Sequence, residues 1–109
     1  MIYQHKNYIE YLDDMGHPHR EDGPAIIHDN GTKEWFIHGL RHRTDGPAIE
    51  YSDGLKEWWF KGRTHREDGP AIIYSDGEVS WILKGIEYYT EQEYQNELVK
   101  IKLDRLKNL

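Results

Sequence analysis

A unit of 23 residues recurs three times along this chain, and a tandem repeat of this kind constrains the fold more than any other feature of the sequence. The segment His19-Arg20-Glu21-Asp22-Gly23-Pro24-Ala25 returns as residues 42–48 and as residues 65–71. A tryptophan and a glycine follow each copy at fixed distances. The tryptophans are Trp35, Trp58 and Trp81, and a partial copy upstream carries Leu12 at the corresponding position. We therefore expect one structural unit repeated along the chain rather than a succession of unlike elements.

Glycines divide the repeats into strand-sized segments. The chain has ten glycines, spaced seven or eight residues apart, and the dipeptides Asn30-Gly31, Asp53-Gly54 and Asp76-Gly77 are typical of two-residue hairpin turns. The segments between the glycines hold about five residues and are rich in Ile, Trp, Tyr and Phe, which favour strands. The sequence thus predicts a mainly β fold, an antiparallel β-meander of nine or ten short strands over residues 8–89.

Counting outward from these turns gives a predicted strand register. Ile26 is expected opposite Trp35, and Trp35 opposite His42. One face of the sheet would then combine isoleucine, tryptophan and histidine or tyrosine in every copy. The equivalent sets are Ile49, Trp58 and His65, and Ile72, Trp81 and Tyr88. The opposite face would carry Phe36, Trp59 and Ile82 among Arg41, Arg43, Arg63 and Arg66, with Glu34 opposite Arg43 and Glu57 opposite Arg66.

The pattern changes after Tyr89. Thr90-Glu91-Gln92-Glu93 has the spacing of a helix capping box. The apolar residues that follow spread over a broad arc of a helix; they are Tyr94, Leu98, Val99, Ile101, Leu103, Leu106 and Leu109. We predict one C-terminal amphipathic helix over residues 90–109, about 30 Å long, lying across the tryptophan face. Residues 1–109 would form a single domain.

Composition narrows the function classes. The net charge is -6 and acidic and basic residues alternate, which argues against a nucleic-acid-binding protein. The chain lacks cysteine, so disulfides and cysteine-bound zinc are excluded and a reducing compartment is expected. No segment approaches the ~20 apolar residues of a membrane helix, and the first ten residues lack the apolar centre of a signal peptide. We expect no membrane association and a cytoplasmic location.

The unit Trp-x-x-x-Gly-x-x-His-Arg-x-Asp-Gly-Pro-Ala resembles repeats in small proteins of bacteriophages and large DNA viruses. It is more distantly similar to the MORN-type repeats of bacterial antitoxin-like proteins. The resemblance spans roughly residues 8–89 and departs from the pattern at Leu12, at Pro18 and at Tyr88-Tyr89, which replace His-Arg. It implies a β-meander, a viral origin with the host cytoplasm as location, and a scaffold for contacts with other molecules.

The histidines raise two chemical hypotheses. His17 and His19 share one side of a strand, but His42 and His65 are expected three strands apart, about 14 Å, too far to share one zinc ion. We therefore predict packed, hydrogen-bonded histidines and no metal.

The His-Arg-x-Asp cluster could supply an acid and a base, yet its presence in each copy favours a structural role. Asp22, Asp45 and Asp68 would hold the Gly-Pro turns through side-chain to backbone hydrogen bonds. An enzyme or a cofactor is not expected.

The preferred hypothesis is a non-catalytic interaction protein that captures a host protein, for example to inhibit a host defence factor. Its candidate binding residues are Phe36, Arg43, Trp59, Arg63, Arg66 and Ile82, because Trp and Arg dominate binding hot spots. A homodimer formed on this face is a related hypothesis. The alternative is a protein that sequesters a nucleotide or another small anion, with Arg43, Arg66 and aromatic rings as the clamp. A concave pocket would favour the alternative, and a flat face the first hypothesis.

Overall fold

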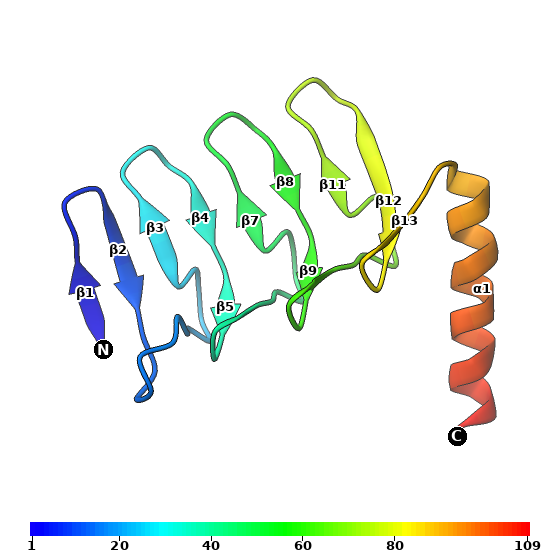
Figure 1. The fold of residues 1–109 in the computed structure, drawn as a ribbon, viewed down its shortest axis with the longest axis horizontal. Coiled ribbons are helices and arrows are strands. Elements are labelled where there is room, and N and C mark those ends of the chain that lie inside the picture. Colours follow the sequence, from blue (N-terminus) through cyan, green and yellow to red (C-terminus); the bar gives the residue numbers. More distant parts are fainter.

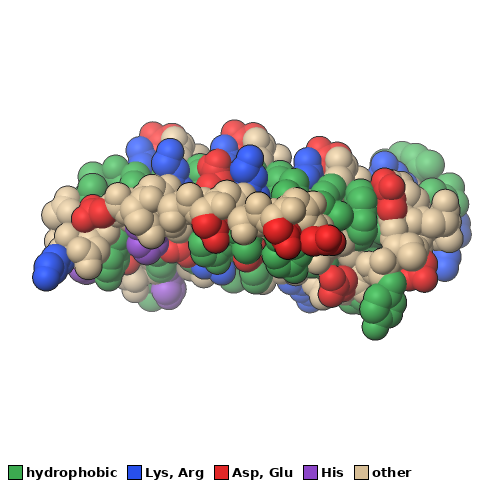
Figure 2. Space-filling model, turned by 90° about the horizontal axis from the view of Figure 1, so that it is seen from above, with side chains coloured by type: hydrophobic (Ala, Val, Ile, Leu, Met, Phe, Trp, Pro, Cys, Tyr) green, Lys and Arg blue, Asp and Glu red, His purple; other side chains and the backbone are tan.

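The computed structural model describes residues 1–109 as a thin sheet, one layer deep, with a single helix at one end (Figure 1). The molecule measures 45 × 38 × 18 Å, and only 11 of its 109 residues are buried. Acidic and basic side chains lie interspersed along its surface in Figure 2, as the sequence indicates. A layer this thin has no central core, so neighbouring strands and the side chains stacked on them must supply most of the stability.

The chain forms thirteen strands and one helix. They are β1 (Ile2–Gln4), β2 (Tyr8–Tyr11), β3 (Ile26–His28), β4 (Lys33–Glu34), β5 (Phe36–Ile37), β6 (Leu40–Arg41), β7 (Ile49–Glu50), β8 (Lys56–Glu57), β9 (Trp59–Phe60), β10 (Arg63–Thr64), β11 (Ile72–Ile73), β12 (Val79–Leu83), β13 (Ile86–Tyr88) and α1 (Glu91–Lys107).

Nine strands form one antiparallel sheet in the order β1-β2-β3-β4-β7-β8-β11-β12-β13. The two small hairpins β5-β6 and β9-β10 extend below it, and the β12-β13 hairpin is their continuous counterpart (Figure 1). Each repeat therefore contributes a long hairpin and a short one. The predicted antiparallel β-meander with one C-terminal helix is confirmed. The strand number is larger than predicted because two of the long strands break at Trp35 and Trp58, and because β1 lies before the predicted range.

The short hairpins have the predicted register. Phe36 pairs with Arg41, and the backbone N–H of His42 donates to the carbonyl of Trp35 over 3.2 Å. His38 and Gly39 form the turn, with φ values of 45° and 82°. Positive φ at both central residues is the property of a two-residue hairpin turn that matches the twist of its strands.

The long hairpins do not have the predicted register. Ile26 pairs with Glu34 instead of Trp35. The N–H of His28 donates to the carbonyl of Thr32 over 2.9 Å, so three residues form the loop and Gly31 takes a positive φ of 96°. A three-residue loop ending in a left-handed glycine is the next most common hairpin connection, and its extra residue shifts the register by one.

This shift moves the isoleucines to the face opposite the tryptophans. Ile26, Ile49 and Ile72 form one cross-strand row with Glu34 and Glu57. The predicted face of isoleucine and tryptophan is therefore wrong. The tryptophans share their face with the histidines of the short hairpins, whereas the isoleucines share theirs with glutamates.

The histidines join consecutive short hairpins. The Nδ1 atom of His42 accepts a hydrogen bond from the backbone N–H of Lys61 over 2.9 Å, and His65 accepts one from Lys84 over 2.8 Å. Burial lowers the pKa of His42, and the charge of Lys61 adds to this effect, so the acceptor form is favoured. The structure thus places these histidines in packed, hydrogen-bonded positions, and it contains no group of side chains arranged to hold a metal ion.

The arginine of each repeat packs on an aromatic ring. The Cζ atom of Arg43 lies 3.9 Å from the centroid of the Trp35 ring. Its Nε donates to Asp45 over 2.8 Å and its Nη1 to the carbonyl of Pro47 over 2.9 Å. A Cβ atom on Gly46 would lie 2.8 Å from that Cζ, so only glycine admits the guanidinium here. Asp45 thus holds the arginine side chain, and the predicted side-chain to backbone bond at this turn is wrong.

Equivalent stacks occur in the other repeats. Arg66 lies over Trp58 at 3.9 Å and bonds Asp68, and Arg20 lies over Tyr11 at 4.0 Å and bonds Asp22. Tyr11, and not Leu12, therefore takes the place of tryptophan in the partial copy. The turn that follows Tyr11 is one residue longer than its counterparts, because the N–H of His19 donates to the carbonyl of Tyr11.

Helix α1 closes one end of the sheet and does not lie across the tryptophan face, contrary to the prediction (Figure 1). Thr90 caps it by accepting from the N–H of Glu93. Tyr94, Leu98 and Ile101 of α1 pack with Leu83 of β12 into the single apolar core cluster of the molecule. The helix buries one of its sides against the β12-β13 hairpin. It thereby covers the end of the array, where no further repeat follows to pack on Leu83.

Candidate functional site

The structure divides the six predicted binding residues between the two faces of the sheet. Phe36 and Trp59 share one face. Arg43, Arg63 and Arg66 lie on the other, because Arg63 pairs with Phe60 and not with Trp59. The error follows from assigning arginines to a face by residue type. The predicted ring of three arginines around Trp59 is therefore not formed.

Ile82 is only 6 % exposed, so it belongs to the packed part of the sheet and offers no binding surface. It lies in β12 between Trp81 and Leu83, which pack against α1, so Ile82 points to the opposite face of the sheet. The predicted stripe of three surface residues is reduced to Phe36 and Trp59.

Arg41 connects those two rings. Its Cζ lies 4.9 Å from the ring centroid of Phe36 and 5.1 Å from that of Trp59. Arg41 also donates to Glu34 over 2.7 Å, and the indole N–H of Trp59 donates to Glu57 over 2.9 Å. The predicted ion pairs of Glu34 with Arg43 and of Glu57 with Arg66 are replaced by these contacts, and all five side chains are held within the sheet face.

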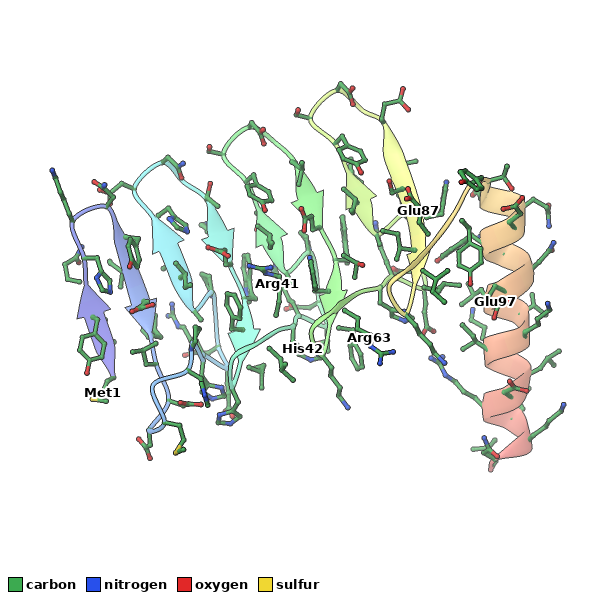
Figure 3. All side chains as sticks on the ribbon, in the orientation of Figure 1. Met1, Arg41, His42, Arg63, Glu87 and Glu97 are labelled. Carbon is green, nitrogen blue, oxygen red and sulfur yellow. The ribbon has the colours of Figure 1, made fainter.

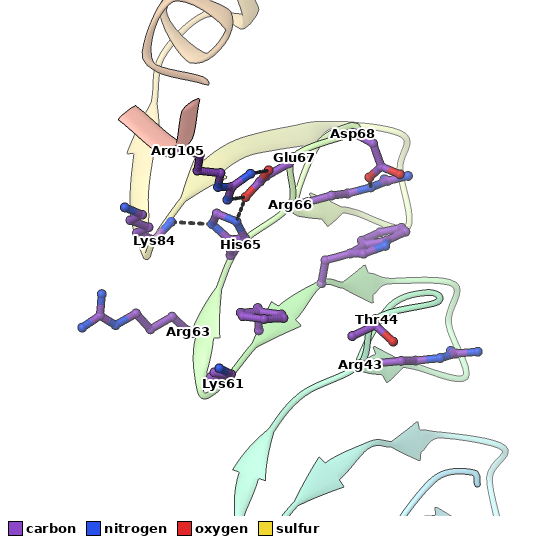
Figure 4. Close-up of a pocket in the computed structure, with 12 residues that line it drawn as sticks. Arg43, Thr44, Lys61, Arg63, His65, Arg66, Glu67, Asp68, Lys84 and Arg105 are labelled. Atoms are coloured by element: carbon purple, nitrogen blue, oxygen red, sulfur yellow. Dashed lines mark hydrogen bonds and ion pairs between the residues drawn. The ribbon is translucent and has the colours of Figure 1, made fainter. Parts of the chain in front are cut away.

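A basic groove lies on the opposite face, beside the β9-β10 hairpin (Figure 4). It has a volume of about 730 Å³. Its lining includes two aromatic rings, Trp58 and Phe60, and two carboxylates, Glu67 and Asp68. Its cationic side chains are Arg43, Lys61, Arg63, Arg66, Lys84 and Arg105. Positive charge is thus concentrated at one place in a protein whose net charge is -6.

One wall of the groove is a fixed network. His65 bonds Glu67 over 2.8 Å through Nε2, and Glu67 accepts two hydrogen bonds from the guanidinium of Arg105 on α1. These bonds from Arg105 lower the pKa of Glu67 to about 2. The helix therefore contributes to the groove wall. Glu67 is ionised, and its two carboxylate oxygens are already bonded to Arg105 and His65.

The other wall is unpaired. Lys61, Arg63 and Lys84 are exposed and make no ion pair with any carboxylate, and Figures 3 and 4 show Arg63 extending away from the hairpin. Phe60 lies among them with 42 % of its surface exposed. The Nζ atom of Lys61 lies 5.3 Å from the centroid of this ring. Cations without a carboxylate partner beside a partly exposed ring can hold an anionic group and a flat group at the same time.

The equivalent groove one repeat earlier has different chemistry. It has a volume of about 480 Å³ and is lined by three carboxylates, Glu21, Asp22 and Asp45, with two arginines. The residues that make the later groove basic and aromatic, Phe60, Lys61 and Arg63, correspond to Ile37, His38 and Leu40. The two grooves are thus formed by equivalent backbone segments but are lined by different side chains.

No protein-family model, curated protein or solved structure matches this chain. The structure has no helix with the length and apolar character needed to cross a bilayer.

Sequence reasoning found three groove residues, Arg43, Arg63 and Arg66, and missed the others. Lys61 and Lys84 could have been found, because both precede the glycine of a hairpin turn and so project from the sheet edge. Arg105 could not, since its place depends on how α1 docks against the last hairpin.

The ion pair between Arg105 and Glu67 gives a testable pH dependence. The pKa of Glu67 is lower in the folded protein, so the pair stabilises the fold above pH 4.5 and loses this effect as the pH falls towards 2. We expect Arg105→Gln to lower the urea midpoint at about pH 7 and to lower it much less at about pH 2.5, because most of the linked stability is lost between these two values. Lys107→Gln, which removes the same charge from the same helical turn, is the control. Equal losses at both pH values would contradict the assignment.

Proposed function

We propose that this protein is a non-catalytic binding protein whose basic groove takes a small anionic ligand that carries a flat ring, such as a nucleotide. The observation that supports this most strongly is the combination of three unpaired cations with an exposed aromatic ring inside one concave surface. Phosphate oxygens prefer Lys and Arg donors, and a base stacks on an aromatic side chain.

In this proposal, different groove residues bind the phosphates and the ring of the ligand. Lys61, Arg63 and Lys84 neutralise the phosphates, while Phe60 stacks against the ring of the ligand. Arg43 and Arg66 are already bonded to Asp45 and Asp68 and shape the groove rather than hold the ligand. Because the same aspartates repeat in every copy, the specific chemistry resides in the hairpin β9-β10 and its neighbours.

Isothermal titration with ATP, adenosine and inorganic pyrophosphate tests the proposal. The variant Lys61→Asn/Arg63→Leu removes two of the free cations, and asparagine tolerates the positive φ of 48° at position 61. We expect it to weaken ATP and pyrophosphate binding about tenfold or more. Phe60→Ile should weaken ATP binding and leave pyrophosphate binding nearly unchanged, since only ATP offers a ring.

Lys56→Gln is the matched control, because Lys56 is an exposed cation on β8 outside the groove. If none of the three compounds binds the native protein at millimolar concentration, or if Lys56→Gln has the same effect as the groove variant, the proposal is wrong.

A host protein remains the second candidate ligand. The observation that favours it is the partly exposed array of Phe36, Arg41 and Trp59 on the opposite face. The resemblance of the repeat to viral proteins supports such a role in an infected host cell. Native mass spectrometry of the protein isolated from its natural host distinguishes the candidates, because a bound nucleotide adds a few hundred daltons and a partner adds the mass of a chain.

A further inference from the structure

Helix α1 carries a second apolar row that the sheet does not cover. Tyr94, Leu98 and Ile101 face the sheet and are buried. Leu103 lies nine residues after Tyr94, and at about 100° per residue this places it on the opposite side of the helix. Figure 3 shows side chains projecting from this outer side with no element opposite them. The helix is therefore apolar on two opposite sides, of which the fold uses one.

The outer row has the spacing of a helix-pairing seam. Asn96, Val99, Leu103 and Leu106 follow one another at intervals of three, four and three residues, as the a and d positions of a heptad do. Val99, Leu103 and Leu106 are 54 %, 52 % and 63 % exposed. Asn96 is the one polar residue of the row and lies at its N-terminal end. Because the sheet is packed by Tyr94, Leu98 and Ile101, packing against the sheet does not account for these exposed apolar residues.

The charges of α1 indicate its partner. Its first half carries Glu91, Glu93 and Glu97, and its second half carries Lys100, Lys102, Arg105 and Lys107, with Asp104 as the one acidic exception. A helix of this kind is complementary to a copy of itself that runs in the opposite direction. In an antiparallel pair, Val99 would meet Leu103 and Asn96 would meet Leu106 of the second copy, while Glu93 would lie near its Lys107.

A parallel pair would fit less well. It would bring Lys102 of one helix next to Lys107 of the other on both rims of the seam, with no pair of opposite charges to offset them. The antiparallel pair forms two contacts between Glu93 and Lys107, although Lys100 and Lys102 each lie near their own copies at the two-fold axis. The antiparallel pair also has a two-fold axis, so the same surface is used twice and the assembly closes at two chains.

We propose that the outer row of α1, formed by Asn96, Val99, Leu103 and Leu106, is a homodimer interface through which two chains pair by antiparallel α1 helices. The two sheets would then extend away from each other on either side of the helix pair. The basic grooves lie on the sheets and do not depend on the dimer, so the two proposals can fail independently.

Sedimentation equilibrium over about 1 to 500 μM tests the interface. We expect the full chain to show a concentration-dependent monomer to dimer transition. Leu103→Glu should raise the dissociation constant about 100-fold or more, because it places a carboxylate in both central layers. Leu109→Glu is the control: it makes the same change just beyond the C-terminal end of α1, outside the seam, and should have little effect. The melting temperature of dilute Leu103→Glu should equal that of the native monomer, since Leu103 does not pack on the sheet.

Charge exchange and cross-linking test the orientation. Lys107→Glu should weaken the dimer, and Glu93→Lys/Lys107→Glu should restore it, which happens only if these positions meet in opposite chains. The chain has no cysteine, so single cysteines report contacts directly. Asn96→Cys mixed with Leu106→Cys should form a mixed disulfide, whereas Leu106→Cys alone should not. A monomer at all concentrations, or efficient Leu106→Cys self-linkage, overturns the proposal.

Discussion

Replacing Tyr94 by alanine is expected to destabilise the protein by about 4 kcal/mol, the largest effect of any single substitution considered for this chain. The side chain is fully buried, its ring lies 4.9 Å from that of Trp81, and its hydroxyl donates to the carbonyl of Arg66 over 2.7 Å. In the earlier repeats an arginine stacks on the tryptophan ring, and at Trp81 the ring of Tyr94 lies in the corresponding position. Its loss would remove the largest of the side chains that join α1 to the array. Urea denaturation followed by circular dichroism measures the effect.

Tyr94→Phe is the control for the ring, because it removes only the hydroxyl group and should cost about 1 kcal/mol. Deleting residues 90–109 should have a still stronger effect, with exposure of Leu83 and loss of cooperative unfolding or aggregation. A truncated chain that stays soluble with an unchanged melting curve would show that α1 is not part of the folding unit.

Replacing Trp58 by alanine is the second large change, and we expect it to cost about 3 kcal/mol. The ring is half-buried under the guanidinium of Arg66, so the loss combines apolar area with the stacking contact. The double variant Trp58→Ala/Arg66→Ala should show a coupling free energy of about 1 kcal/mol between the two side chains. A loss below about 1 kcal/mol for Trp58→Ala would mean that the tryptophans are not structural.

Trp58→Phe separates the two contributions, because phenylalanine retains a ring under Arg66 but fills less volume. We expect its stability to lie between that of the native protein and Trp58→Ala. Near-native stability would show that stacking matters more than the apolar area of the indole.

The repeat period, the strand composition and the helix cap were all accessible from the sequence, because each depends on residues close together in the chain. The register of the long hairpins was not. A three-residue loop and a two-residue loop share the same Asn30-Gly31 signal, and the difference of one residue moved Ile26 from the tryptophan face to the glutamate face.

The candidate site was predicted less well than the fold for the same reason. Arg63 and Trp59 are close in sequence but lie on opposite faces, since Arg63 pairs with Phe60 across the hairpin turn. The position of α1 was also beyond local reasoning. Its length permits it to lie across the sheet, and only the docking of Tyr94 beside Trp81 decides that it stands at the end.

The hydrogen bond from Lys61 to His42 has the same form as that from Lys84 to His65, so every junction along the array is built alike. A duplication of any 69-nucleotide stretch within the repeat region of the gene would therefore insert a unit whose two ends already match their neighbours. The terminal segments would be untouched, and the array would gain a new groove whose lining could diverge under selection. The basic groove beside its acidic counterpart is what such a history of copying and divergence would leave.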